Sequence, residues 1–188
     1  MKMQLLVCGT LLWMAMPAMA ADSFTMDPDY TVPTFEVGHL GFTTQRGRFD
    51  KCEGKVVLDF AAKTGSVAFT VFTNSLDMGS RAWTVHVSSP GLFDIEKYPT
   101  MAFKSDRLVF EADKVVAAEG QFTLLGVTKP ITVSVNHFSC GTNPVNSKFM
   151  CAGDIAATIK RSDWGMTKYI PTVSDEIHIS VPVEAYRD

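Results

Sequence analysis

The chain has 188 residues and a formal net charge of −3, with 46% hydrophobic and 20% charged residues. This weak acidity argues against a nucleic-acid partner, whose phosphates require a basic face, and it leaves no polybasic patch for anionic lipid. The length fits one domain, because the chain contains no internal repeat and no low-complexity linker.

Residues 1–20, MKMQLLVCGTLLWMAMPAMA, have the pattern of a cleaved secretory signal peptide. An apolar run covers residues 5–16, and the segment closes with the small-residue sequence Ala18-Met19-Ala20. The run is shorter than the ~20 residues that a bilayer requires, and the residues around Cys8 disfavour a lipoprotein. We therefore expect an exported, periplasmic protein without a transmembrane segment. Its mature domain spans residues 21–188, where the loss of one lysine leaves 16 basic against 20 acidic residues.

The hydrophobic pattern after residue 20 has a period of two, which is typical of half-buried antiparallel strands. The segment PITVSVNH sets Ile131, Val133 and Val135 on one face and polar residues on the other. In chain order, strands are predicted at Thr34–His39, Thr43–Phe49, Lys55–Phe60, 65–74, Thr100–Glu111, Val115–Leu125, 130–137, Met150–Arg161 and 175–186. Eight or nine short strands at regular intervals predict an all-β, antiparallel barrel or sandwich.

Two segments depart from simple alternation. In residues 75–99, Ser80 is placed to cap a short helix that carries Trp83 and Val87 on one side, although β-branched neighbours weaken this prediction. We expect a long connection with one or two helical turns there. In the last strand, Pro182 lies on the polar face, which suggests an edge position or a bulge.

Three cysteines follow the predicted leader. Cys140 and Cys151 flank GTNPVNSKFM, a segment with turn residues between two strand-like runs, and export implies an oxidising compartment. The simplest interpretation is a disulfide that pins this hairpin. A zinc site is the weaker alternative, because no second close cysteine or histidine pair completes the ligand set. Cys52 is then a buried small hydrophobe, a free thiol or one half of a mixed disulfide.

Sequence motifs for common catalytic chemistries are missing: G-x-S-x-G, H-E-x-x-H, the Walker motif and G-x-G-x-x-G do not occur. Catalysis is therefore disfavoured, and no cofactor or metal is expected. Two alternatives stay open. One is a hydrolase or isomerase of lipid-like substrates, with a histidine beside a serine or aspartate in a cavity. The other is a redox or metal module built on Cys52 and a histidine.

Polar residues near the apolar runs are interpreted mainly as surface groups. Those expected on solvated strand faces or in tight turns are Asp59, Lys160, Arg161 and Asp163. His137 and His178 are expected at the surface, whereas the sequence does not place His86.

Apolar side chains are present in surplus. The residues after position 20 retain all thirteen phenylalanines, together with Trp83 and Trp164. A barrel of about eight strands can enclose one small ligand, and ligand sites are usually concave and apolar. The competing interpretation is that these rings simply fill a solid core.

Four segments together resemble the YceI-like family of exported bacterial proteins. They are VGHLGFTTQRGRF (37–49), GLFDIEKYPTMAFKS (91–105), GVTKPITVSV (126–135) and IKRSDWGM (159–166), and their order and spacing match over the mature chain. The resemblance implies a lipocalin-like antiparallel barrel with a helical excursion. It also implies a polyisoprenoid ligand, such as an isoprenoid quinone or a prenyl phosphate. The cysteine-flanked hairpin is similar to that of one branch of the family.

This sequence departs from the family pattern at two places. Where related sequences have an acidic residue between the tryptophan and the histidine and a basic residue soon after, this chain has Thr84, Val85 and Ser88. Cys52 stands where we expect a polar residue. Contacts that those charges make elsewhere, at a mouth or to a head group, are therefore not carried over to this chain.

Strand parity and aromatic character select candidate residues for the lumen. They are Phe35, Val37, His39, Phe49, Phe69, Val71, Phe103, Phe122, Leu124 and Trp164. His39 is expected either to bind a quinone carbonyl or head group, or to satisfy a buried backbone carbonyl. Arg46 and Arg48 have the opposite parity to Phe49 and are expected to face solvent or to pair with acidic groups. The predicted function is non-catalytic lipid binding. The oligomeric state is left open, and a dimer is compatible with the sequence.

Overall fold

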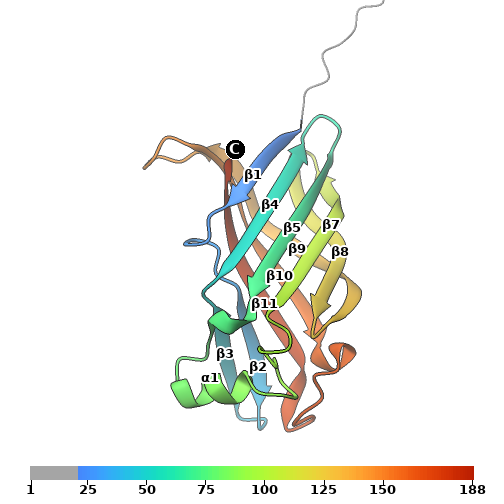
Figure 1. Ribbon diagram of the computed structural model, residues 1–188. Coiled ribbons are helices and arrows are strands. Elements are labelled where there is room, and N and C mark those ends of the chain that lie inside the picture. The colour runs from blue at the N-terminus through green and yellow to red at the C-terminus, as the bar shows by residue number, and fades with distance from the viewer. Residues whose placement is uncertain (1–20) are drawn as a thin grey trace, which may run out of the picture.

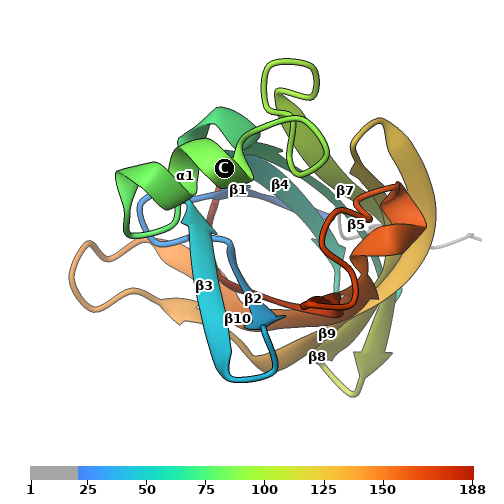
Figure 2. The ribbon, with the colours of Figure 1, turned by 90° about the horizontal axis from the view of Figure 1, so that it is seen from below.

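Apolar residues at alternate positions close the chain into an antiparallel barrel. The structure is a computed structural model that describes residues 21–188; the predicted signal peptide, residues 1–20, lies outside the described residues. Eight strands form the closed ring, which the end-on view shows clearly (Figures 1 and 2). In ring order they are β1 (Asp22–Met26), β4 (Cys52–Asp59), β5 (Thr64–Phe72), β7 (Thr100–Glu111), β8 (Lys114–Leu124), β9 (Val127–Thr142), β10 (Phe149–Lys160) and β11 (Val173–Arg187). The predicted lipocalin-like barrel of about eight strands is confirmed.

The strand β11 joins the two ends of the ring. One of its edges pairs with β10 from Lys160 to Met150, and its other edge pairs with β1 near Arg187. On that second edge, residues before Val181 pair with β2 (Thr34–His39) instead. Pro182 lies between these two pairings, so its missing N–H faces a local gap in the ladder. The strand is therefore interior to the sheet, and Pro182 lies at an edge only locally, with no register shift opposite β10.

The sheet continues beyond β11 through three further strands, in the order β2, β3 (Thr43–Phe49) and β6 (Leu76–Asp77). With the helix α1 (Arg81–Val87), these strands form the lower part of the molecule in Figure 1. Two single 3-10 turns complete the described elements, η1 (Thr73–Ser75) and η2 (Arg161–Trp164).

The predicted short helix is present as α1, and it lies beside the barrel opening (Figure 2). Ser80 occupies the N-cap position with extended backbone, but its hydroxyl makes no capping hydrogen bond. The Oγ1 of Thr84 instead accepts a hydrogen bond from the Met78 N–H at 3.1 Å, which fixes the entry into the helix. Among residues 21–188, no helix is long and apolar enough to cross a membrane.

All nine predicted strands are present, and the structure adds two that the pattern did not show. The first, β1, is only five residues long, and the second, β6, is only two. Strand β9 also runs on from residue 137 to Thr142, where polar and exposed residues replace the alternation. Short or solvated strands carry too few apolar positions for a period of two to be visible.

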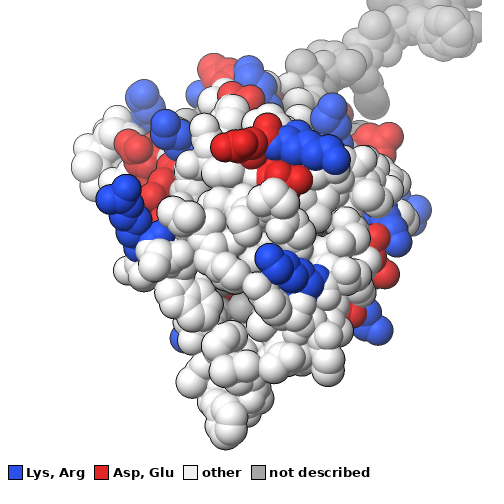
Figure 3. All heavy atoms as spheres, turned by 60° about the horizontal axis from the view of Figure 1, so that its bottom comes forward, with Lys and Arg blue, Asp and Glu red and all other residues white. Residues whose placement is uncertain are grey.

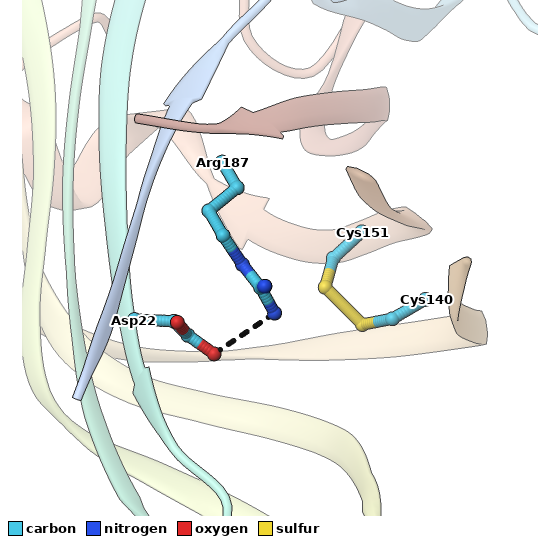
Figure 4. Close-up of a disulfide and its surroundings, with 4 residues drawn as sticks. All are labelled: Asp22, Cys140, Cys151 and Arg187. Atoms are coloured by element: carbon cyan, nitrogen blue, oxygen red, sulfur yellow. Dashed lines mark hydrogen bonds and ion pairs between the residues drawn. A yellow bond between two sulfur atoms is a disulfide. The ribbon is translucent and has the colours of Figure 1, made fainter. Parts of the chain in front are cut away.

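The hairpin between β9 and β10 is joined by the predicted disulfide. Cys140 and Cys151 face each other across the two strands, with an S–S distance of 2.07 Å and a Cα–Cα distance of 4.0 Å. Figure 4 shows the disulfide beside the ion pair that Arg187 of β11 makes with Asp22 of β1, at 3.1 Å. The Arg187 guanidinium also lies 4.1 Å from the centre of the Phe149 ring. These contacts tie the hairpin to the seam of the barrel.

Candidate ligand-binding cavity

The barrel encloses a cavity of about 690 Å³ with walls that are almost entirely apolar. All eight ring strands contribute inward-facing side chains, among them Phe24, Leu58, Phe69, Phe103, Ala118, Val133, Ile155 and Ile179. The volume falls in the range of ~300–1,000 Å³ that is common for small-molecule sites. The apolar residues that recur at every second position of the strands therefore form the wall of this cavity.

The cavity is hollow and is not filled by the protein's own rings. Several side chains that point inward, including Phe69, Phe103 and Ile131, are only half-buried because they border open space. Aromatic packing is instead local: the rings of Phe35, Phe49 and Phe93 meet with centroid distances of 5.3 to 5.9 Å. The interpretation of a solid aromatic core is overturned by this cavity.

Nine of the ten predicted lumen residues line the cavity. They are Phe35, Val37, His39, Phe49, Phe69, Val71, Phe103, Phe122 and Leu124. Trp164 does not line it: its side chain lies behind Phe122, with ring centroids 5.6 Å apart, and its indole N–H donates to the Phe122 carbonyl at 3.2 Å. Contact between any of these residues and a ligand stays a prediction.

The cavity opens at one end of the barrel. The exposed residues among its lining all belong to three segments at that end, the turn after β2, the helix α1 and the loop 165–172: Leu40, Ala82, Trp83, His86, Tyr169 and Thr172. At the other end no described lining residue is exposed: Phe24 and Cys151 are buried, and Phe138 and Gly153 are half-buried. A ligand can therefore enter past these three segments, which we call the mouth.

Contacts between the three segments hold the mouth together. The rings of His39 and Trp83 meet edge to face at 5.3 Å, which joins β2 to α1. The rings of His86 and Tyr169 lie 5.7 Å apart and join α1 to the loop 165–172. The Leu40 N–H donates to the Thr172 carbonyl at 2.8 Å, which joins that loop to the turn after β2.

The β2–β3 hairpin divides as predicted into an inner and an outer face. Arg46 and Arg48 are exposed, and they pair with Glu36 at 2.7 Å and with Asp50 at 2.9 Å. His39 points to the cavity instead, and within residues 21–188 its ring contacts Trp83 but makes no hydrogen bond. The structure therefore does not show the backbone contact that was one of the two expectations for His39.

Arg161 lies in the turn η2, one of its two expected settings, but the expectation that it is a surface group is wrong, because the residue is only 2% exposed. Its guanidinium donates to four main-chain carbonyl oxygens at 2.8 to 3.0 Å, those of Met166, Lys168, Val173 and Ser174. Burial lowers the pKa of this guanidinium, and nearby Asp175 partly offsets the effect. Arg161 therefore holds the loop 165–172, one side of the mouth, against the barrel. Asp59 and Asp163 do lie in turns or on the surface, as expected.

Cys52 is a buried free thiol at the start of β4. Its Sγ donates to the Thr31 carbonyl at 2.9 Å, and burial raises the pKa of the thiol to about 11. Among residues 21–188, Cys52 therefore combines the first two of its three alternatives: it is buried like a small hydrophobe, and its thiol is free.

The geometry that the catalytic and metal alternatives require is not found in the described part of the chain. Residues 21–188 hold no cluster of three or more metal-ligating His, Cys, Asp or Glu side chains. His137 and His178 do contact Asp154 at 2.9 Å and Glu176 at 3.4 Å, but both histidines are exposed on the outside of the barrel. Within residues 21–188, the imidazole rings of the two histidines that line the cavity, His39 and His86, make no hydrogen bond to a serine or aspartate side chain.

A closed eight-stranded antiparallel barrel with an apolar cavity open at one end is a lipocalin-like barrel. The chain belongs to the YceI-like family, because the family model described as "YceI-like domain" matches residues 24–185. A "UPF0312 protein" of Pseudomonas aeruginosa (strain LESB58) is 29% identical over 184 residues, which is 97% of this chain and 95% of that protein.

Solved structures share the same fold. The crystal structure of Burkholderia cenocepacia BcnA has a TM-score of 0.73 at 23% identity and covers 85% of this chain and 98% of its own. A polyisoprenoid binding domain from Saccharophagus degradans, implicated in plant cell wall breakdown, has a TM-score of 0.64 at 15% identity. The match covers 88% of this chain and 98% of that domain's chain. At these identities the likenesses show the fold alone.

Proposed function

We propose that the protein is an exported, non-catalytic binding protein that holds a long isoprenoid lipid, or a similar lipid, in its barrel as a periplasmic carrier or reservoir. The observation that carries this proposal is the apolar cavity of about 690 Å³ with a single mouth. The pattern of residues 1–20 supports export. The relative from Saccharophagus degradans, which is called a polyisoprenoid binding domain, supports the ligand class.

Burial of hydrocarbon alone supplies enough free energy for this function. Each isoprene unit has five carbons, and at ~0.8 kcal/mol per buried CH₂-sized group it contributes roughly 4 kcal/mol before costs are deducted. Three or four units then exceed the several kcal/mol lost on ordering the ligand. A strong polar anchor is therefore unnecessary, which fits a wall that is almost entirely apolar.

Mass spectrometry of bound lipid is the direct test. Protein purified gently from its native host is extracted with organic solvent, and we expect an isoprenoid quinone, a prenyl phosphate or a related lipid in stoichiometric amount. An extract without lipid, from protein that also fails to take up added isoprenoid, would refute the proposal.

A matched pair of variants locates the ligand within the barrel. Ala157 of β10 lines the cavity, whereas its neighbour Ala156 has the opposite parity and does not. Ala157→Phe fills part of the lumen and should lower isoprenoid affinity about ten-fold or more, because several CH₂ groups lose their place. Ala156→Phe, with the same change of residue, should bind like the parent protein. Equal binding by both variants places the ligand elsewhere.

His39 is the proposed contact for a polar head group at the mouth. Replacing it by phenylalanine keeps a ring against Trp83, from which His39 lies 5.3 Å, but removes both ring nitrogens. His39→Phe should weaken binding of an isoprenoid quinone about three- to ten-fold, as expected for one neutral hydrogen bond. The affinity for an isoprenoid hydrocarbon of equal length is the control and should not change. If His39→Phe binds the quinone as tightly as the parent protein does, His39 is not part of the binding site.

A further inference from the structure

Three segments around the mouth expose large apolar side chains to water. Phe42 at the tip of the turn after β2 is 90% exposed, Val85 of α1 is 66% exposed and Leu40 is 50% exposed. Trp83 and Tyr169, also at the mouth, are 38% and 45% exposed. We call these five residues the apolar rim. Contiguous exposed apolar side chains on a folded domain usually mark an interaction surface.

The rim segments also carry almost no formal charge. Residues 39–45 (HLGFTTQ) contain no Asp, Glu, Lys or Arg, residues 81–89 (RAWTVHVSS) contain only Arg81, and residues 165–173 (GMTKYIPTV) contain only Lys168. The face of the molecule that includes this end shows charged side chains along its upper, left and right borders and one basic side chain near its centre, while its lowest part is uncharged (Figure 3). Elsewhere the strands carry many exposed ion pairs, such as Arg107–Glu119.

We propose that the apolar rim docks the protein, mouth first, on the surface of a lipid bilayer. This inference rests on the proposed function, because an isoprenoid resides in membranes and can pass into the cavity without crossing water only where the mouth meets the bilayer. The rim is continuous with the cavity wall: Leu40, Trp83 and Tyr169 belong to both.

The residue types of the rim fit the membrane interface. Trp and Tyr concentrate at the boundary between head groups and hydrocarbon, and exposed Phe, Leu and Val insert just below it. The Lys168 ammonium lies 5.1 Å from the centre of the Tyr169 ring, so a cation stands beside the rim where lipid phosphates would lie. With one lysine, one arginine (Arg81 of α1) and no polybasic patch, binding should depend on apolar burial and only weakly on anionic lipid or salt.

Flotation with vesicles that contain no isoprenoid tests the docking. We expect the purified protein to float with phosphatidylethanolamine–phosphatidylglycerol vesicles, and the bound fraction to change little between low and high salt. The double variant Phe42→Ser/Val85→Ser removes two rim side chains that do not line the cavity, and it should lower the partition coefficient roughly ten-fold or more. Isoprenoid binding by this variant in detergent solution should stay unchanged.

Val145 provides a matched control. It is 91% exposed, as Phe42 is, but it lies on the hairpin between β9 and β10, away from α1 (Figure 1). Val145→Ser should float like the parent protein. Quenching of tryptophan fluorescence by brominated lipid should occur in the parent and be lost in Trp83→Phe, which places the mouth rather than the hairpin in the bilayer.

The outcomes separate this inference from the proposed function. A protein that binds isoprenoid in detergent but never floats, or whose rim variant floats like the parent, overturns the docking alone. A protein that floats but binds no isoprenoid overturns the proposed function alone. The parent protein could also be a dimer by light scattering, with the rim variant a monomer and neither protein bound to vesicles. The rim would then be an interface between two copies, and the membrane proposal would be wrong.

Discussion

The guanidinium of Arg161 is the main polar group that holds the loop at the mouth. Its four hydrogen bonds reach two carbonyl oxygens within the loop 165–172 and two in the residues directly after it. Arg161→Ala should lower the free energy of unfolding by about 3–5 kcal/mol in urea titrations, because buried carbonyls lose a charged donor. Arg161→Lys should recover only part of the loss, since an ammonium cannot reproduce the planar fork. Arg46→Ala, which breaks an exposed ion pair, should change stability by less than about 1 kcal/mol.

The buried thiol of Cys52 gives stability a defined dependence on high pH. Its pKa is about 11 in the folded protein against an ordinary value of 9.0, so between these values the unfolded chain loses a proton that the folded chain keeps. The contribution of this group is therefore complete below about pH 9 and is lost as the pH rises toward 11. The stability difference between the parent and Cys52→Ala should shrink over this interval in urea titrations.

Thiol titration checks the same residue at neutral pH. The folded protein should not react with a disulfide reagent at pH 8, whereas the unfolded, unreduced protein should expose one thiol among residues 21–188. Rapid reaction in the folded state would contradict the burial of Cys52 described above.

At the scale of single residues, the sequence predicts whether a side chain faces the lumen or the solvent only where the residue lies on a regular strand. Phe35, Val37 and Phe49 face the lumen because alternation fixes their side. Arg161 and Trp164 lie in the turn η2, where no period exists, and the polar segment KRSD gives no sign that Arg161 is buried. His86 was missed for the same reason, since one helix of seven residues does not define which side faces the cavity.

The β9–β10 hairpin is the element with the clearest stability prediction. Its disulfide joins residues 11 positions apart, and a loop of that size restricts the unfolded chain by about 3 kcal/mol. The double variant Cys140→Ala/Cys151→Ala should lose roughly this amount in urea titrations without reductant. Adding reductant should destabilise the parent to a similar extent and leave the variant unchanged. A parent protein indifferent to reductant would show that the bond contributes nothing.

At the scale of elements, hydrophobic periodicity was sufficient for every strand longer than five residues. It located β7 and β10 because their inward positions are apolar over a long run. It failed for β1, whose alternation of Phe24 and Met26 with polar residues lasts only one and a half periods beside the leader. No local pattern could reveal β6, because its two residues become a strand only by pairing with β3.

At the scale of the whole molecule, a hollow barrel should gain stability from its ligand. A ligand that binds only the folded state adds about 2.7 kcal/mol at a free concentration one hundred times its dissociation constant. We therefore expect the melting temperature to rise with added isoprenoid, and the rise to be much smaller for Ala157→Phe than for Ala156→Phe. Scanning calorimetry at several ligand concentrations measures this. Equal shifts for both variants would mean that the ligand acts outside the cavity.

The position of β11 has a consequence for how the chain folds. This strand is the last in chain order, yet it alone bridges β10 to both β1 and β2, strands that are formed about 150 residues earlier. Until β11 is added, the other seven ring strands can form only an open sheet with two unpaired edge strands and an exposed apolar face. Intermediates of this kind tend to aggregate. A nascent polypeptide of this design must therefore be shielded, by a chaperone or by being kept unfolded, for almost the entire time of its synthesis.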